Sequence, residues 1–216
     1  FIGTSMGGSL IVIRDALTAE VLAKGLTKGG TGNTEAIMNT PKERFDESHV
    51  GSAAFETTLS LSKPLFVNIE AMAPVNHESR VITSTQVWLI PGKHLDEQGI
   101  ILEIPGFVID GLYPQTHQGF SLEEDKSIEI KANMVMMCGC TISPDGLWDG
   151  NMMEVEAHVY VNGEFWQTLK MENSTDNTFT SNLTLEKTGS HEVVITAFDP
   201  RTKNTGVDEL NFRVAN

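Results

Sequence analysis

The sequence predicts an all-β protein made of two tandem β-sandwich domains. Apolar and polar residues alternate with period two through many short runs, which is the pattern of half-buried strands. Turn residues separate the runs, among them Pro91-Gly92, Pro144-Asp145-Gly146 and Asn162-Gly163. The pattern restarts near residue 105, so one domain is expected over residues 1–105 and a second over residues 106–216.

The first domain is expected to hold five strands and one long loop. The alternating runs cover residues 9–15, 20–27, 53–61, 64–73 and 80–90. Between the second and third of them lies a polar, glycine-bearing insertion, residues 28–51. A loop of this length is uncommon in a compact domain and is expected to be functional or to cover one end of the sheet.

Residues 9–90 resemble the carboxypeptidase-regulatory-like (transthyretin-like) β-sandwich module. The resemblance lies in the strand SLIVIRD with its Asp15-Ala16 turn, the strand around Ala23, the Phe55-x3-Leu59 spacing and the strand VNIEA. The family's Thr-Asp-Gly before the middle strand is replaced by Gly-Ser-Ala at residues 51–53. Such modules are non-catalytic appendages, so the resemblance implies scaffolding or binding.

The second domain is expected to be an immunoglobulin-like sandwich. Short apolar runs at residues 107–112 and 120–122 are followed by alternating runs at 128–138, 153–161, 165–171, 179–185, 191–198 and 209–214. Short strands at such spacing, without a helix, are typical of this fold. The closing segments ITAFDP and NFRV resemble the last hairpin of bacterial immunoglobulin-like modules, a resemblance that specifies the fold alone.

The charge is strongly acidic, with 15 Lys plus Arg against 29 Asp plus Glu and a formal net charge of −14. Nucleic acid and anionic lipid need a basic face, so neither is expected as a partner. No apolar run approaches the ~18 residues that a membrane span requires. The acidity favours solubility, with a cation or a basic partner as the other interpretation.

The segment MVMMCGC gathers sulfur-bearing residues on one predicted strand. Period two places Met134, Met136, Cys138 and Cys140 on one face, and His158 on a later strand is a further possible ligand. Thiolate and thioether sulfur prefer Cu(I), so copper is the one cofactor that the sequence indicates. The alternatives are that these residues fill the core, or that the cysteines form a redox-active thiol pair.

The catalytic motifs are incomplete. Residues 3–7, GTSMG, match the nucleophile-elbow pattern but lack the flanking strand and helix that it needs. His77-Glu78 and His191-Glu192 begin the HExxH zinc motif, but Val81 and Ile195 stand where the second histidine is required. No catalytic residue is therefore assigned.

A tryptophan-aspartate pair, Trp148-Asp149, sits on the glycine-bearing turn that follows the cysteines and is a candidate contact site for a partner. The other interpretation is that Trp148 caps the core. The sequence thus predicts a non-enzymatic, extracytoplasmic binding or scaffolding protein whose partner is an unknown protein or surface ligand. The alternative is a Cu(I)-binding or thiol-redox protein centred on the MVMMCGC segment.

Overall fold

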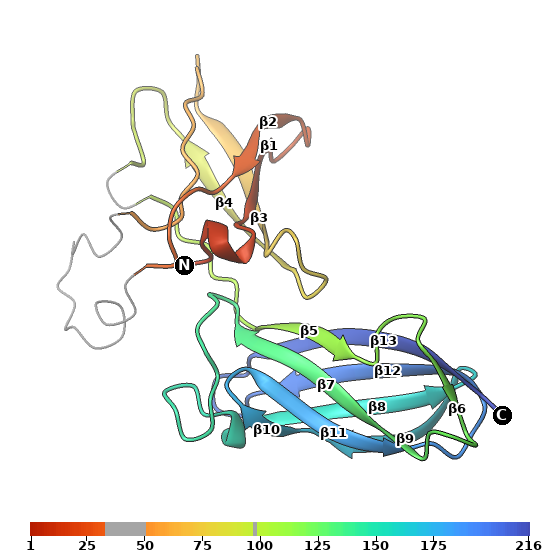
Figure 1. Cartoon of the computed structure of the whole chain (residues 1–216). Coiled ribbons are helices and arrows are strands. Elements are labelled where there is room, and N and C mark those ends of the chain that lie inside the picture. Colours follow the sequence, from red (N-terminus) through yellow and green to blue (C-terminus); the bar gives the residue numbers. More distant parts are fainter. Residues whose placement is uncertain (33–50, 97–98) are drawn as a thin grey trace. The chain divides into compact units, whose positions relative to one another are not determined.

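The computed structural model describes residues 1–32, 51–96 and 99–216, and this part of the chain is almost entirely β-structure (Figure 1). It contains strands β1 to β13 and two short 3-10 turns, η1 (Thr4–Met6) and η2 (Gly150–Met152). The all-β, sandwich-type fold that the sequence predicts is therefore confirmed. The chain divides into two compact units, Phe1–Ile104 and Pro105–Asn216. None of the described helical segments is long and apolar enough to cross a membrane.

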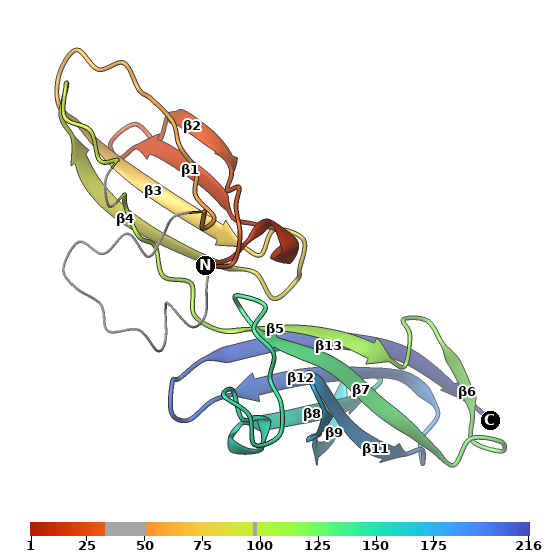
Figure 2. The same ribbon diagram turned by 60° about the vertical axis from the view of Figure 1, so that its left-hand side comes forward.

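The first unit contains a four-stranded antiparallel sheet with the order β2-β1-β3-β4 (Figure 2). Its strands are β1 (Leu10–Asp15), β2 (Val21–Leu26), β3 (Leu65–Ala73) and β4 (Val81–Leu89). The β1–β2 pairing is bulged between Ile13 and Arg14, whereas the β3–β4 register is regular throughout. Within the described residues, β2 and β4 form the two edges of this sheet.

One face of this sheet carries the core of the first unit. Ile13, Val67 and Ile69 are buried there, and Phe55, Leu59 and Leu102 pack over them from outside the sheet. Phe55 lies so close to Gly25 that a Cβ at this glycine would stand 2.5 Å from the ring.

The expected strand at residues 53–61 is not formed. Among the described residues, the chain makes isolated bridges where this segment begins, between Lys28 and Ala54 and between Gly30 and Ser52. Alternation still buries Phe55 and Leu59, but the segment lies across the sheet face, where no neighbouring strand can form a ladder with it. Of the expected loop 28–51, residues 33–50 lie outside the described part of the chain.

The second unit is a sandwich of two sheets, ordered β10-β11-β7-β5 and β6-β13-β12-β8-β9 (Figure 1). The first sheet consists of β5 (Phe107–Tyr113), β7 (Ser127–Met136), β10 (Glu172–Thr175) and β11 (Thr178–Thr184). The second consists of β6 (Gly119–Ser121), β8 (Glu154–Val161), β9 (Glu164–Lys170), β12 (Gly189–Phe198) and β13 (Thr205–Ala215).

The core of the second unit is the apolar layer between the two sheets. Phe107, Phe179, Ile130 and Ile195 are almost completely buried in it, and burial of each such side chain stabilises the fold by roughly 1.5–3 kcal/mol. The sheets approach most closely where β5 faces β13. There the amide of Gly111 donates to the Asp208 carboxylate over 2.6 Å.

The β12–β13 turn is closed by a buried carboxylate. Asp199 accepts hydrogen bonds from Nε and Nη2 of Arg201 at 3.0 and 3.1 Å, and from the Arg201 amide at 2.9 Å. Burial by itself would raise the pKa of Asp199, but the hydrogen bonds from Arg201 and Thr202 outweigh it and hold the pKa below 3.8. The turn is therefore fixed by an ionised group.

Candidate functional site

The two cysteines lie in a tight loop after β7 and not on the strand itself. The strand ends at Met136, whose amide donates to the Cys140 carbonyl at 3.1 Å. Gly139 has a φ of 82° and donates its amide to the Met136 carbonyl at 2.7 Å. The expected strand to residue 138 was therefore too long, because a residue in the left-handed region ends the pleat and folds the chain back.

This loop brings the two thiols together. The Sγ atoms of Cys138 and Cys140 are 2.7 Å apart, and both residues are present as half-buried thiols. Both side chains pack against the core of the second unit. Two sulfur atoms that share a metal at about 2.3 Å each, with tetrahedral angles, would stand about 3.8 Å apart. The two sulfur atoms are therefore closer together than two sulfur ligands of one metal ion would be.

The methionines of this segment belong to the core. Met134 and Met136 are 1% and 6% exposed and lie within the apolar layer between the sheets. Met137 is also buried, whereas Met152 is 53% exposed. Thioether sulfur in these two core positions is surrounded by apolar side chains, so the structure supports the core-filling interpretation for Met134 and Met136.

His158 is not brought to the sulfur atoms. Its neighbours along β8, Ala157 and Val159, point into the core, so the histidine faces the outer side of the five-stranded sheet. Its ring nitrogens are 3.0 Å from the hydroxyls of Thr168 and Thr196. Across the described ranges, no group of three or more His, Cys, Asp or Glu side chains could hold a metal ion.

The Trp148-Asp149 turn is organised by its own hydrogen bonds. Oδ1 of Asp149 accepts the amides of Asp145 at 3.0 Å and Asn151 at 2.9 Å, and Ser143 donates its amide to the Trp148 carbonyl at 3.1 Å. Trp148 is half-buried and packs against the core. These contacts favour a structural role for the pair, with Leu147, 65% exposed, as the apolar residue that the turn presents to solvent.

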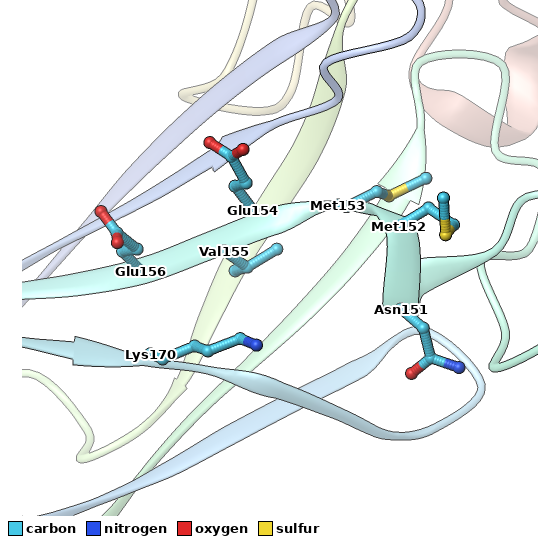
Figure 3. A pocket seen from close by; sticks show the side chains of 7 residues that line it. All are labelled: Asn151, Met152, Met153, Glu154, Val155, Glu156 and Lys170. Atoms are coloured by element: carbon cyan, nitrogen blue, oxygen red, sulfur yellow. The ribbon is translucent and has the colours of Figure 1, made fainter.

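A depression of ≈ 320 Å³ lies where β8 and β9 meet η2 (Figure 3). It is lined by Asn151, Met152, Met153, Glu154, Val155, Glu156 and Lys170. The ionisable side chains of this lining are those of Glu154, Glu156 and Lys170, and the other four lining residues are an asparagine, two methionines and a valine.

His191 is fully buried in the second unit and is a core residue. Its ring stacks on Phe212 at a centroid distance of 4.9 Å, and Nδ1 lies 3.3 Å from the Gly189 carbonyl oxygen. Burial lowers the pKa of His191 below 6.5, and Lys187 lowers it further against the opposing effect of the Gly189 carbonyl. The imidazole is therefore neutral at pH 7.

The free edge of β4 is a feature that the sequence analysis did not identify. Ala16 donates its amide to the Phe66 carbonyl at 2.9 Å, so Phe66 presents its backbone groups to the β1 side. Successive residues of a strand present these groups to opposite edges, so Val67 and Ile69 bond to β4. Their partners there are Val87 and Thr85.

The alternate residues of β4 therefore present their backbone groups to the edge that faces away from β3. These are Ile82, Ser84, Gln86 and Trp88, whose side chains are all exposed. In the described part of the chain, no hydrogen bond reaches the outward amides or carbonyls of these residues. Ile82 and Trp88 are 66% and 59% exposed, and the Trp88 ring packs at 5.0 Å on Phe66.

No family model and no curated protein matches this chain. Among solved structures, an engineered protein is 14% identical over 51% of this chain, with a TM-score of 0.38, and this chain covers 20% of its length. The fibronectin(III)-like modules of CbhA from Clostridium thermocellum are 12% identical over 97% of this chain and 79% of theirs, with a TM-score of 0.32. The chain is an all-β protein of the sandwich type, and its function has to be argued from its own residues.

Proposed function

We propose that this chain is a non-enzymatic, extracytoplasmic binding or scaffolding protein that binds another polypeptide by strand addition at β4. The observation that carries the proposal is the outward backbone of Ile82, Ser84, Gln86 and Trp88, which has no hydrogen-bond partner among the described residues and runs along an uncharged strand. An extended segment that pairs with this edge gains a ladder of backbone hydrogen bonds, each worth about 0.5–1.5 kcal/mol net.

The edge of β4 lacks the features that normally prevent such pairing. Proteins protect their edge strands with charges, prolines, bulges or very short strands. β4 is 9 residues long, VITSTQVWL, without a charge, a proline or a glycine, and its register with β3 has no bulge. A long, unprotected edge is what a strand-accepting protein needs.

The other edges in the described part of the chain carry such protection. β2 contains Lys24 and pairs through a bulge, and β9 contains Glu164 and Lys170 and is also bulged. β5 contains Asp110, and its pairing with β7 is bulged after Gly111. β10 and β6 are only 4 and 3 residues long. The contrast within one molecule supports a specific role for β4.

The outer face beside β4 would add apolar contact to the backbone ladder. The registers place Ile82 opposite Met72, Met72 opposite Leu10, and Leu10 opposite Leu26. This row runs across all four strands on the outer face of the sheet, opposite the face that Phe55, Leu59 and Leu102 cover. A strand added at β4 extends the row and covers part of the Ile82 side chain, so the apolar contribution is smaller than the roughly 1.5–3 kcal/mol of complete burial.

The extracytoplasmic and scaffolding parts of the proposal are supported by the architecture and by sequence resemblance. Tandem β-modules are a common solution for display, because their loops vary without disturbing the sheets. The resemblance of residues 9–90 to carboxypeptidase-regulatory-like modules points to the same non-catalytic class, whereas the resemblance of residues 106–216 to bacterial immunoglobulin-like domains supports the fold alone.

The test measures binding of a fluorescein-labelled peptide of alternating valine and threonine, as long as β4, by fluorescence anisotropy. The wild-type chain is expected to bind it, with slowed hydrogen exchange at the amides of Ser84 and Gln86. Ser84→Pro removes one outward amide without breaking a bond to β3 and is expected to weaken binding at least tenfold.

The matched control is Ser84→Ala, which keeps the amide and is expected to bind like the wild type. Thermal unfolding of both variants verifies that the sheet is intact. Equal affinity of the wild type and the proline variant, or absence of peptide binding at any concentration tested, would overturn the strand-addition proposal.

A second candidate function follows from the thiol contact in the second unit. The separation of 2.7 Å between the Cys138 and Cys140 sulfur atoms favours reversible disulfide formation over metal chelation. In exchange with oxidised glutathione, the two thiols give up two hydrogens to form one disulfide, and two glutathione thiols are released. A bridge across a single intervening residue is strained and therefore easily reduced.

Thiol titration under denaturing conditions, with and without prior reduction, tests this second candidate. A redox pair is expected to lose two titratable thiols after treatment with oxidised glutathione and to regain them with dithiothreitol. Elemental analysis after incubation with Cu(I) tests the copper alternative, with Cys138→Ser/Cys140→Ser as the control. Two thiols that persist in oxidised glutathione, together with no bound copper, would leave the pair as a structural element.

A further inference from the structure

We propose that the strand which adds to β4 is β4 of a second copy of this chain, so that two sheets join into one across a twofold axis at Thr85. This inference rests on the proposed function, because it names the partner of the same edge. The proposal depends on the self-complementarity of β4. When the strand pairs antiparallel with a second copy of itself, its outward residues lie opposite residues of matching chemistry.

The hydrogen-bonding geometry selects one register. In an antiparallel pair, residues that face each other across the ladder must both present their backbone groups to it. With Thr85 opposite Thr85, Ile82 faces Trp88 of the second copy and Ser84 faces Gln86 of the second copy. This register uses every outward residue and forms about eight backbone hydrogen bonds.

Neighbouring registers are less favourable. A shift by one residue sets outward-facing groups against inward-facing ones and removes the ladder. A shift by two residues sets Ser84 opposite Ser84 and leaves Trp88 without a partner inside the strand. The Thr85-centred register therefore has the most hydrogen bonds and the best-matched side chains.

The side chains in this register are chemically matched. Ile82 beside Trp88 is an aliphatic–aromatic pair, which contributes about 0.2–1 kcal/mol relative to alanine in cross-strand positions. Ser84 beside Gln86 joins a hydroxyl to an amide, each able to donate and accept a hydrogen bond. The twofold axis repeats both pairs.

The charge distribution permits self-association at this edge despite a net charge of −14. β4 carries no charge. On the adjacent strand, the Oε2 atom of Glu70 lies 3.6 Å from Nε of Arg14, so this carboxylate is paired. Outside β4, Arg80 precedes the strand and Lys93 follows it. Because the proposed interface is confined to one strand of each copy, whereas stable interfaces bury about 1,000 Å² or more, a concentration-dependent dimer is expected.

A cysteine placed at the twofold axis tests the register. Residues 85 of the two copies form a non-hydrogen-bonded pair with Cα atoms about 4.5 Å apart, which lies within the range that a disulfide spans. Thr85→Cys, in a Cys138→Ser/Cys140→Ser background, is expected to form a disulfide-linked dimer in oxidised glutathione buffer. Non-reducing electrophoresis measures the cross-linked fraction.

Thr83→Cys in the same background is the matched control. It makes the same chemical change on the same face of the same strand, but the proposed register separates the two copies of residue 83 by four positions, about 13 Å. Its cross-linked fraction is expected to be at least tenfold lower. Equal cross-linking of the two variants, or none in the Thr85 variant, would overturn the dimer.

Analytical ultracentrifugation separates failure of this inference from failure of the proposed function. The wild type is expected to shift from monomer to dimer as its concentration rises, and Ser84→Pro to remain monomeric. A wild-type monomer that still binds the valine-threonine peptide would contradict the second-copy partner and leave strand addition standing. A wild type that neither dimerises nor binds the peptide would contradict both.

Discussion

The amide of Ala16 lies 2.9 Å from the carbonyl oxygen of Phe66, and this hydrogen bond shows which backbone groups of β3 face β1. Because backbone groups alternate along a strand, the residues between them face β4. The regular β3–β4 register then shows that Ser84 and Gln86 present their amides to the outer edge of β4. The candidate binding surface follows from this alternation.

The pH dependence of stability should report the burial of His191. Its pKa is lowered below 6.5 in the folded state, so the unfolded chain binds the proton more readily. The contribution to stability is full above pH 6.5 and is lost as the pH falls through and below that value. Urea unfolding between pH 7.5 and about 5.5 measures the effect, in an interval where most ordinary carboxylates stay ionised.

Replacing this histidine should reduce that pH dependence. His191→Phe keeps an aromatic ring against Phe212 and has no proton to gain, so its stability is expected to fall less than that of the wild type over the same interval. His117→Gln, on an exposed turn, is the control and should keep the wild-type slope. A slope in His191→Phe equal to that of the wild type would contradict the assignment to His191.

The close approach of β5 to β13 predicts a sharp response to one added methyl group. A Cβ at Gly111 would overlap the side chain of Leu210, so Gly111→Ala is expected to destabilise the fold by about 1–3 kcal/mol. At Gly119 nothing lies within 4 Å of the corresponding position, so Gly119→Ala should be nearly neutral. Thermal unfolding of the two variants compares them, and equal midpoints would contradict the packing.

The β12–β13 turn should depend on the charge of Asp199. Asp199→Asn puts a neutral amide in the buried position that accepts the Arg201 hydrogen bonds. The change is expected to lower the free energy of unfolding by about 1–3 kcal/mol. Because the pKa of Asp199 lies below 3.8, its contribution is present above that pH and is lost as the pH falls below it. Chemical denaturation at pH 7 measures the loss, with the exposed Glu209→Gln as the control.

The covering segment of the first unit should be sensitive at Phe55. Phe55→Ala removes the ring that packs on Gly25 and is expected to destabilise the first unit. A fully buried ring would cost about 3–5 kcal/mol, and the cost here is expected to be lower because the Phe55 ring is partly exposed. Hydrogen exchange measured by mass spectrometry should show faster exchange in β1 and β2. Glu56→Ala, an exposed neighbour, should leave those rates unchanged, and equal rates in both variants would contradict the covering role.

Local patterns were sufficient to predict most strands. The alternation through Leu65–Ala73, Val81–Leu89 and Glu154–Val161 is a property of neighbouring residues, so a strand follows without knowledge of its partners. The same rule was wrong at residues 53–61, where Phe55 and Leu59 alternate because they cover a sheet. It was also wrong after Met136, where Gly139 turns the chain and brings together two cysteines that a strand would hold further apart.

By itself, the sequence determined the all-β class, the strand-forming runs and the sulfur-rich segment, because each depends on residues close together along the chain. Only the tertiary structure decided that Met134 and Met136 lie in the core, that His158 faces away from them and that β4 is an edge. These outcomes depend on which strands pair and with what register. Pairing between distant segments is set by the packing of the whole sheet, which local alternation does not encode.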